Sequence, residues 1–114
     1  MVQTGTFTIG ITNGKGELCR EYILHERTFR NTLELGSDPD IKIEQISDPV
    51  YYDAAIYSKR LKVAGIDKLT PEMVLDLEGA DGDELSIACV KLDQRRAEFR
   101  KEQQTAAKAA VGPD

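Results

Sequence analysis

The amino-acid sequence predicts an α+β fold, in which an amino-terminal β-hairpin packs on a small bundle of three to four α-helices. Strand-like alternation is confined to the first quarter of the chain, and helical spacing fills residues 48–104. The chain has 114 residues, enough for one domain but too few for two independent cores. We therefore expect a single α+β domain over residues 1–104 and a disordered carboxy-terminal tail over residues 105–114.

The predicted hairpin covers residues 5–24. Its first strand places on one side the apolar residues Phe7, Ile9 and Ile11. Asn13-Gly14 is the strongest two-residue turn signal, although Gly16 leaves room for a longer, bulged loop. In the second strand, over residues 17–24, the apolar side chains fall on both faces: Leu18, Tyr22 and Leu24 on one, Cys19 and Ile23 on the other. The inner face of this strand is therefore only weakly specified.

A short helix is expected after the hairpin, capped by Thr28 and ended by Gly36. Phe29 and Leu33 would lie on its buried side. Residues 37–47 are expected to form a loop with a possible short strand at 41–44, because Asp and Pro interrupt the helix and the spacing of the isoleucines fits neither period.

Asp48-Pro49 is a strong start signal for a second helix, because the Asp side chain can accept from free N–H groups and Pro at the first position loses no bond. We expect this helix to run to about Ala64 and to stop at Gly65. Its apolar stripe would consist of Val50, Ala54, Tyr57, Leu61 and Ala64, widened by Tyr51 and Ala55.

Thr70-Pro71 repeats the cap-and-proline pattern and predicts a short helix through Leu77, closed by Gly79. Asp81 and Glu84 have the spacing of a capping box at the start of the longest helix, whose pattern fades near Gln104. The stripe of this last helix is Leu85, Ala88, Cys89, Leu92, Arg96 and Phe99. The predicted core is Phe7, Val50, Ala54, Leu61, Val74, Leu77, Leu85, Ala88 and Leu92.

The composition argues against several classes of protein. With 15 basic and 20 acidic residues the net charge is −5, which disfavours non-specific nucleic-acid binding. The first residues lack the pattern of a signal peptide and no apolar stretch reaches membrane-spanning length, so we expect a cytoplasmic protein with no membrane partner. Two separate cysteines and one histidine suggest neither a metal site nor a disulfide framework.

No motif indicates catalysis or a cofactor. The acidic run from Asp76 to Glu84 lacks the spacing of an EF-hand loop, and helix capping explains it better than calcium. His25 has no nucleophile motif around it. Gly10, Gly14 and Gly16 do not form a phosphate-binding loop and are interpreted as turn glycines. We therefore expect no catalytic residues, no cofactor and no enzyme activity.

The order of parts resembles the small tail-assembly chaperones of Mu-like and other contractile-tailed phages and prophages. The resemblance covers roughly residues 5–100, through FTIGITNGKGELCREYIL, the RTFRNT segment, YYDAAIYSKRLKVAGI and LTPEMVLDLEGADGDELSIACVKLDQRRAEF. It implies a non-enzymatic protein that binds the tape-measure or tail-tube protein during tail assembly. In several relatives a frameshift adds a longer carboxy-terminal extension, which would join here between Ala106 and Asp114. The alternative is a small prophage-encoded structural or adaptor protein.

A chaperone of this kind needs a groove with apolar walls and a charged rim. The hairpin and the second helix contain more tyrosine than an aliphatic core of this size needs, and a tyrosine tolerates a half-exposed position. Arginines of the last helix would supply the rim. The expected partner-binding residues are Tyr22, Tyr52, Tyr57, Arg95, Arg96 and Arg100.

Overall fold

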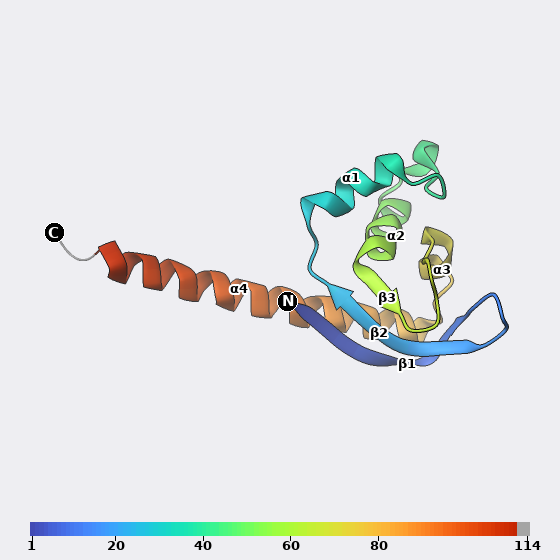
Figure 1. Ribbon diagram of the computed structural model, residues 1–114, viewed down its shortest axis with the longest axis horizontal. Helices are drawn as coiled ribbons and strands as arrows, with labels where there is room; N and C mark the ends of the chain where they lie inside the picture. Colours follow the sequence, from blue (N-terminus) through green and yellow to red (C-terminus); the bar gives the residue numbers. More distant parts are fainter. Residues whose placement is uncertain (112–114) are drawn as a thin grey trace.

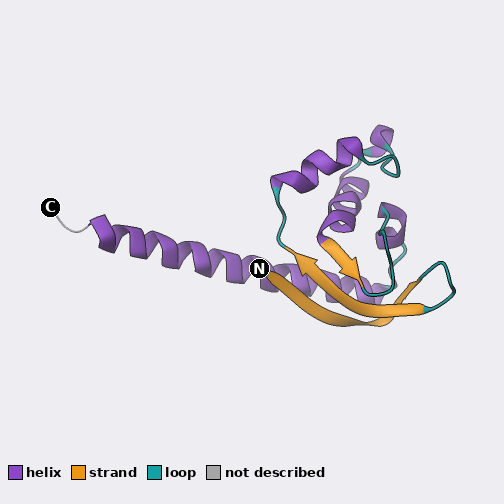
Figure 2. Cartoon of the chain, viewed as in Figure 1, coloured by secondary structure: helices purple, strands orange, loops and turns teal. Residues whose placement is uncertain are grey.

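The computed structural model describes residues 1–111, with side chains described through residue 106. It confirms the α+β class: a three-stranded antiparallel sheet is combined with four helices in the described part of the chain (Figures 1 and 2). The elements are β1 (Val2–Thr12), β2 (Leu18–His25), α1 (Phe29–Ser37), a 3-10 turn η1 (Ile43–Gln45), α2 (Pro49–Arg60), β3 (Leu61–Val63), α3 (Pro71–Leu75) and α4 (Gly79–Val111).

The hairpin forms as predicted, with the longer loop that Gly16 allowed. The Asn13 N–H donates to the Glu17 carbonyl at 2.9 Å, and the Asn13 side-chain oxygen accepts from the N–H groups of Lys15 and Glu17. Gly16 adopts a φ of 80°, a conformation that glycine reaches without strain. The loop therefore closes around the Asn13 side chain instead of forming a two-residue turn.

β1 contains a large bulge that changes which residues face the core. Thr6 is paired with Glu21 and Ile11 with Cys19, so β1 advances much further than β2 between these pairs. Gly10 has a φ of 94° at this point, and a Cβ there would lie 2.5 Å from the Cys19 carbonyl oxygen. As a result Phe7 is buried as predicted, whereas Ile9, which alternation placed on the same side of the strand, is 44% exposed.

The second predicted helix ends earlier than expected, because its last residues form a strand. α2 stops at Arg60, and Leu61–Val63 pair with β2 as β3, Leu61 opposite Leu24 and Val63 opposite Tyr22. The prediction of a helix to Ala64 was therefore wrong. The apolar spacing of residues 61–64 fits a helix as well as a strand, and the pairing with β2 decides in favour of the strand.

The predicted buried side of α2 is also partly wrong. Ala54, Tyr51 and Ala55 are buried as expected, but Val50 is 65% exposed. The side chains that α2 buries are Tyr51, Ala54, Ala55, Ile56, Ser58 and Arg60. The buried face of α2 is rotated because α2 packs on α1 on one side and on the core between the sheet and α4 on the other.

α1 turns the opposite way from the prediction. Phe29 is 74% exposed and Leu33 is exposed, whereas Leu35 is buried against Tyr51 of α2. Asn31 is buried at the start of the helix, where its side-chain oxygen accepts from the Thr28 N–H at 2.8 Å. The strand suggested at 41–44 does not form, and η1 covers part of that segment.

Both cap-and-proline starts are confirmed. The Asp48 side chain accepts from the Val50 N–H at 2.9 Å, and the Thr70 hydroxyl accepts from the Met73 N–H at 3.3 Å. α3 ends at Leu75 instead of Leu77, and Gly79 begins α4 instead of closing the preceding helix.

α4 is longer than the sequence pattern suggested. It begins two residues before Asp81 and is helical through Val111, beyond Gln104 where the apolar pattern fades. Alanines between residues 106 and 110 favour a helix by propensity, and the disorder expected from residue 105 stays a prediction. Residues 112–114, the end of this predicted tail, lie outside the described residues.

The core consists of two clusters. The larger joins the sheet to α4 and includes the predicted residues Phe7, Leu61, Leu85, Ala88 and Leu92, while Val74 and Leu77 pack against it half-buried. The smaller joins α1 to α2 through Leu35, Ile41, Tyr51, Ala55 and Ile56. α4 passes behind the sheet and projects beyond it (Figure 1).

Replacing Gly5 with Ala should lower the free energy of unfolding by about 1–3 kcal/mol, the usual range for overpacking. A Cβ at Gly5 would lie 2.5 Å from the Tyr22 hydroxyl oxygen, so the ring would have to leave its position against Phe7. Urea denaturation measures the change. Gly14→Ala is the matched control, because nothing lies within 4 Å of its Cβ position. Equal stabilities of the two variants would contradict this packing.

Candidate binding groove on the open face of the sheet

One face of the sheet is not covered by any helix of the described chain. Register and strand alternation place six exposed residues together on this face: Thr4, Thr6, Glu21, Ile23, Lys62 and Ala64. The opposite face carries Tyr22, Leu24 and Val63, which belong to the main core with α4. We call the uncovered side the outer face.

The outer face is hollowed. A groove of about 500 Å³ crosses all three strands, from Thr4 of β1 to Lys62 of β3. Its surface is mainly apolar, and its lining includes Ala64, Ile66 and the 41% exposed side chain of Ile23. Glu21 and Lys62 supply one charge of each sign. An apolar groove with charged groups beside it suits a protein segment better than a small charged substrate.

The structure does not support the prediction for Tyr22. This residue is 2% exposed, its ring stacks on Phe7 at a centroid distance of 4.6 Å, and its hydroxyl donates to Glu84 Oε1 at 2.8 Å. Burial, together with the hydrogen bond to Glu84, raises the pKa of the Tyr22 phenol. Tyr22 therefore stabilises the core and offers no aromatic surface to a partner.

Tyr52 and Tyr57 are half-buried on different sides of α2. The Tyr52 hydroxyl accepts from Arg27 Nη2 at 2.8 Å, and Tyr52 packs on the smaller cluster. Tyr57 packs on the larger cluster with the Arg60 guanidinium 5.6 Å from its ring centroid. Burial, with a hydrogen bond to Cys89, raises the pKa of the Tyr57 phenol. Each ring already has partners within the fold.

The three predicted arginines lie on α4, a different helix from the one that carries Tyr52 and Tyr57. Arg95 and Arg100 are exposed and Arg96 is half-buried. Arg95 donates to the backbone carbonyl of Val2 at the start of β1. The six predicted residues are therefore divided among the core, two sides of α2 and one helix, and they do not line the groove described above apart from the buried Tyr22.

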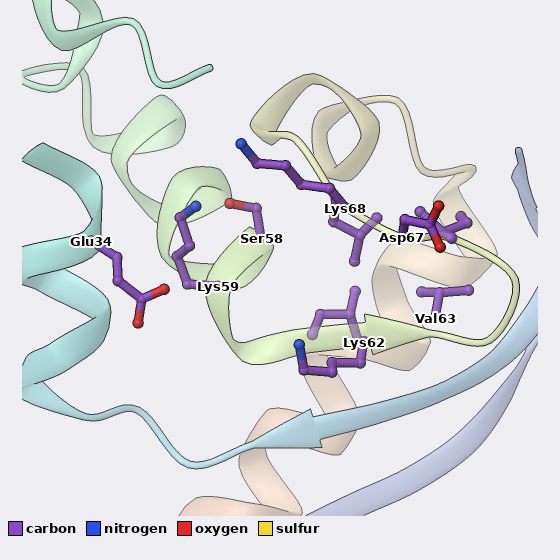
Figure 3. A pocket seen from close by; sticks show the side chains of 10 residues that line it. Glu34, Ser58, Lys59, Lys62, Val63, Asp67 and Lys68 are labelled. Atoms are coloured by element: carbon purple, nitrogen blue, oxygen red, sulfur yellow. The ribbon is translucent and has the colours of Figure 1, made fainter. Parts of the chain in front are cut away.

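A second, smaller pocket of about 180 Å³ lies beside β3 (Figure 3). Its lining combines four aliphatic residues with the polar residues Glu34, Ser58, Lys59, Lys62, Asp67 and Lys68. Lys59 and Lys68 both bind the carboxylate of Asp38, and Lys68 also lies 2.8 Å from Asp40. Burial acts to raise the pKa of Asp38, but the hydrogen bonds from the two lysines hold it well below its usual range. These charges join α1, α2 and the loop before α3, which is a structural role.

Asp81 binds a different segment from the one that the sequence predicted. Its carboxylate is fully buried and accepts from three consecutive backbone N–H groups of the β1 bulge: Thr8 at 2.6 Å, Ile9 at 3.1 Å and Gly10 at 2.8 Å. Glu84 binds Tyr22 instead of reaching back to the helix start. The capping-box prediction was wrong because both acidic groups bind distant strands.

His25 is exposed at the end of β2, and its backbone carbonyl accepts from Arg60 Nε at 3.0 Å. The described residues contain no group of three or more His, Cys, Asp or Glu side chains able to hold a metal ion.

The outer face could have been found only by recognising β3. The available signal was the alternation in Leu61-Lys62-Val63 followed by Gly65, which has a φ of 92° and sits against Cys19. This alternation is only three residues long, and Leu61 also continues the apolar stripe of α2, so a helix was predicted there instead of a strand.

No family model matches the chain, and no curated protein or solved structure is similar enough to it to count as a match. Among the described helices, none is both long and apolar enough to cross a membrane.

Proposed function

We propose that this chain is a non-enzymatic tail-assembly chaperone of a contractile-tailed phage or prophage, acting in the cytoplasm of the bacterial host. It would hold a segment of the tape-measure or tail-tube protein while the tail is built. The observation that carries the proposal is the apolar groove of about 500 Å³ on the uncovered face of the sheet. The order of sequence elements, which resembles that of such chaperones, supplies the identity of the partner.

The groove meets the physical needs of reversible holding. Its floor lies on three paired strands, so it exists before the partner arrives and costs little ordering on binding. It offers apolar contact without a large continuous patch, because Ile23 and Ala64 have the polar side chains of Thr4, Glu21 and Lys62 as neighbours on this face. The charges of Glu21 and Lys62 favour one orientation of a bound segment.

Co-expression with the tail proteins tests the proposal. The tape-measure or tail-tube protein should co-purify with the parent chain, and Ile23→Glu should reduce the captured amount by roughly tenfold or more, because binding would bury an unpaired carboxylate. The melting temperature should change by only a few degrees, since Ile23 is 41% exposed.

Two further variants locate the surface. Val90→Glu places the same charge on an exposed apolar site of α4 outside the groove, and it should capture the partner like the parent. Tyr52→Ala tests the α2 surface. Loss of capture in Tyr52→Ala with normal capture in Ile23→Glu would move the binding surface to α2.

The chain should also be absent from purified virions. If neither tail protein is captured, the chaperone proposal is wrong. Finding the chain in finished particles would favour a structural or adaptor protein instead.

A further inference from the structure

The outer edge of β1 carries backbone groups that the sheet does not use. In an antiparallel pair, residues alternately direct their N–H and C=O groups toward and away from the partner strand. The Ala64 N–H donates to the Glu21 carbonyl, so Glu21 and Ile23 direct these groups toward β3, and Tyr22 and Leu24 direct theirs toward β1. Their partners in β1 are Gly5 and Gln3. Thr4 and Thr6 therefore direct their N–H and C=O groups outward.

α4 closes this edge at both ends but not in the middle. Beyond Thr6, the outward N–H of Thr8 donates to Asp81. Before Thr4, the outward carbonyl of Val2 accepts from Arg95. In both contacts a side chain makes the hydrogen bond that the backbone of a neighbouring strand would otherwise make. Among the described residues no side chain hydrogen-bonds to the backbone of Thr4 or Thr6, and both residues are exposed.

One flank of α4 runs beside this open stretch. Glu84, Ile87, Lys91 and Arg95 follow one another at helical spacing on this flank. Its two ends are fixed by contacts: Glu84 binds Tyr22, whose hydroxyl lies next to Gly5, and Arg95 binds Val2. Between them Ile87 is 52% exposed and Lys91 is exposed. The open edge thus has an apolar and a basic side chain beside it.

We propose that the edge of β1 at Thr4–Thr6 captures an extended segment of a partner protein as an additional strand. The segment has alternating apolar residues and carries acidic residues. Strand addition of this kind uses main-chain hydrogen bonds for affinity and alternate side chains for selectivity. One set of side chains would extend the outer face, and the other would meet Ile87, Lys91 and Arg95. This inference builds on the proposed function, because it states how the segment is held.

A second copy of the chain fits this edge poorly. Pairing two β1 strands edge to edge would bring them to about 4.8 Å apart. α4 packs directly against β1 in each copy, so the two α4 helices would approach more closely than the roughly 8–10 Å that packed helices need. A single extended strand has no such helix beneath it.

A model peptide tests the edge without the tail proteins. The probe is a seven-residue peptide with blocked ends in which Val and Glu alternate, measured by fluorescence anisotropy. Thr6→Pro should weaken its binding roughly tenfold or more, since proline removes the outward N–H and leaves the inward hydrogen bonds to β2 in place. Thr6→Ala, which keeps the N–H, should bind within about twofold of the parent. A peptide in which Val and Lys alternate should bind more weakly than the Glu peptide.

Amide hydrogen exchange on the parent protein gives a second readout that needs no variant. Without the peptide, Thr4 and Thr6 should exchange faster than Gln3 and Gly5, and the Glu peptide should protect Thr4 and Thr6. Absence of peptide binding, binding without this protection, or equal binding by Thr6→Pro would overturn the inference. Self-association that Thr6→Pro abolishes would show that a second copy occupies the edge. Capture of a tail protein without protection at Thr4 and Thr6 would leave the proposed function standing and remove only strand addition.

Discussion

Asp81→Ala should lower the free energy of unfolding by about 3–5 kcal/mol, because it removes a buried carboxylate that accepts from three backbone N–H groups. The Asp81 carboxylate is fully buried and binds the N–H groups of Thr8, Ile9 and Gly10 in the bulge of β1. These residues are more than 70 positions from Asp81 in the sequence, so the contact ties α4 to the first strand. Urea denaturation followed by circular dichroism measures the loss.

Two other substitutions define the cause of that loss. Asp83→Ala removes an exposed carboxylate from the same turn of α4 and should change the free energy of unfolding by no more than about 0.5 kcal/mol. Asp81→Asn keeps the size of the side chain but turns one acceptor oxygen into a donor group, so it should also destabilise strongly. A loss below about 1 kcal/mol in Asp81→Ala would mean that water replaces the carboxylate easily.

The features predicted correctly from the sequence are those encoded by neighbouring residues. Asp48 and Thr70 cap their helices as expected, because a cap and the N–H groups that it binds lie within three residues of each other. The Asn13 loop is of the same kind, since one side chain binds the backbone two and four residues away. Local chemistry was sufficient at these positions.

The errors occur where a distant segment decides the conformation. Leu61 continues the apolar stripe of α2, and only its pairing with Leu24 of β2 makes it part of a strand. Ile9 alternates correctly with Phe7, but the bulge that binds Asp81 turns it outward. Neither Leu24 nor Asp81 is within reach of a local sequence window.

The candidate site also depends on contacts between segments that are distant in the sequence. Counting tyrosines showed an excess of aromatic surface, but it could not show that Tyr22 is placed against Phe7 and Glu84. The groove on the outer face requires three strands in register, so it became visible only once β3 was known. Residues such as Thr4 and Ile23 carry no chemical signature of binding.

Leu92→Ala should lower the free energy of unfolding by about 2–5 kcal/mol, the range observed when a buried leucine is truncated and the cavity only partly collapses. Leu92 is 1% exposed and lies in the main core cluster with Leu24 and Phe7. Since 1 kcal/mol corresponds to roughly 4–8 °C for a domain near 100 residues, the melting temperature should fall by at least about 8 °C.

Val90→Ala is the matched control, because Val90 is on the same helix but 55% exposed, and its variant should melt within a few degrees of the parent. Comparing Leu92→Ala with Asp81→Ala then separates two ways in which α4 is held. Leu92 anchors the helix by apolar packing, whereas Asp81 anchors it by hydrogen bonds to β1. Because Leu92 and Asp81 hold the same helix against the same strand, the double variant should lose less stability than the sum of the two single losses. Additive losses would mean that α4 can leave β1 at one end while remaining packed at the other.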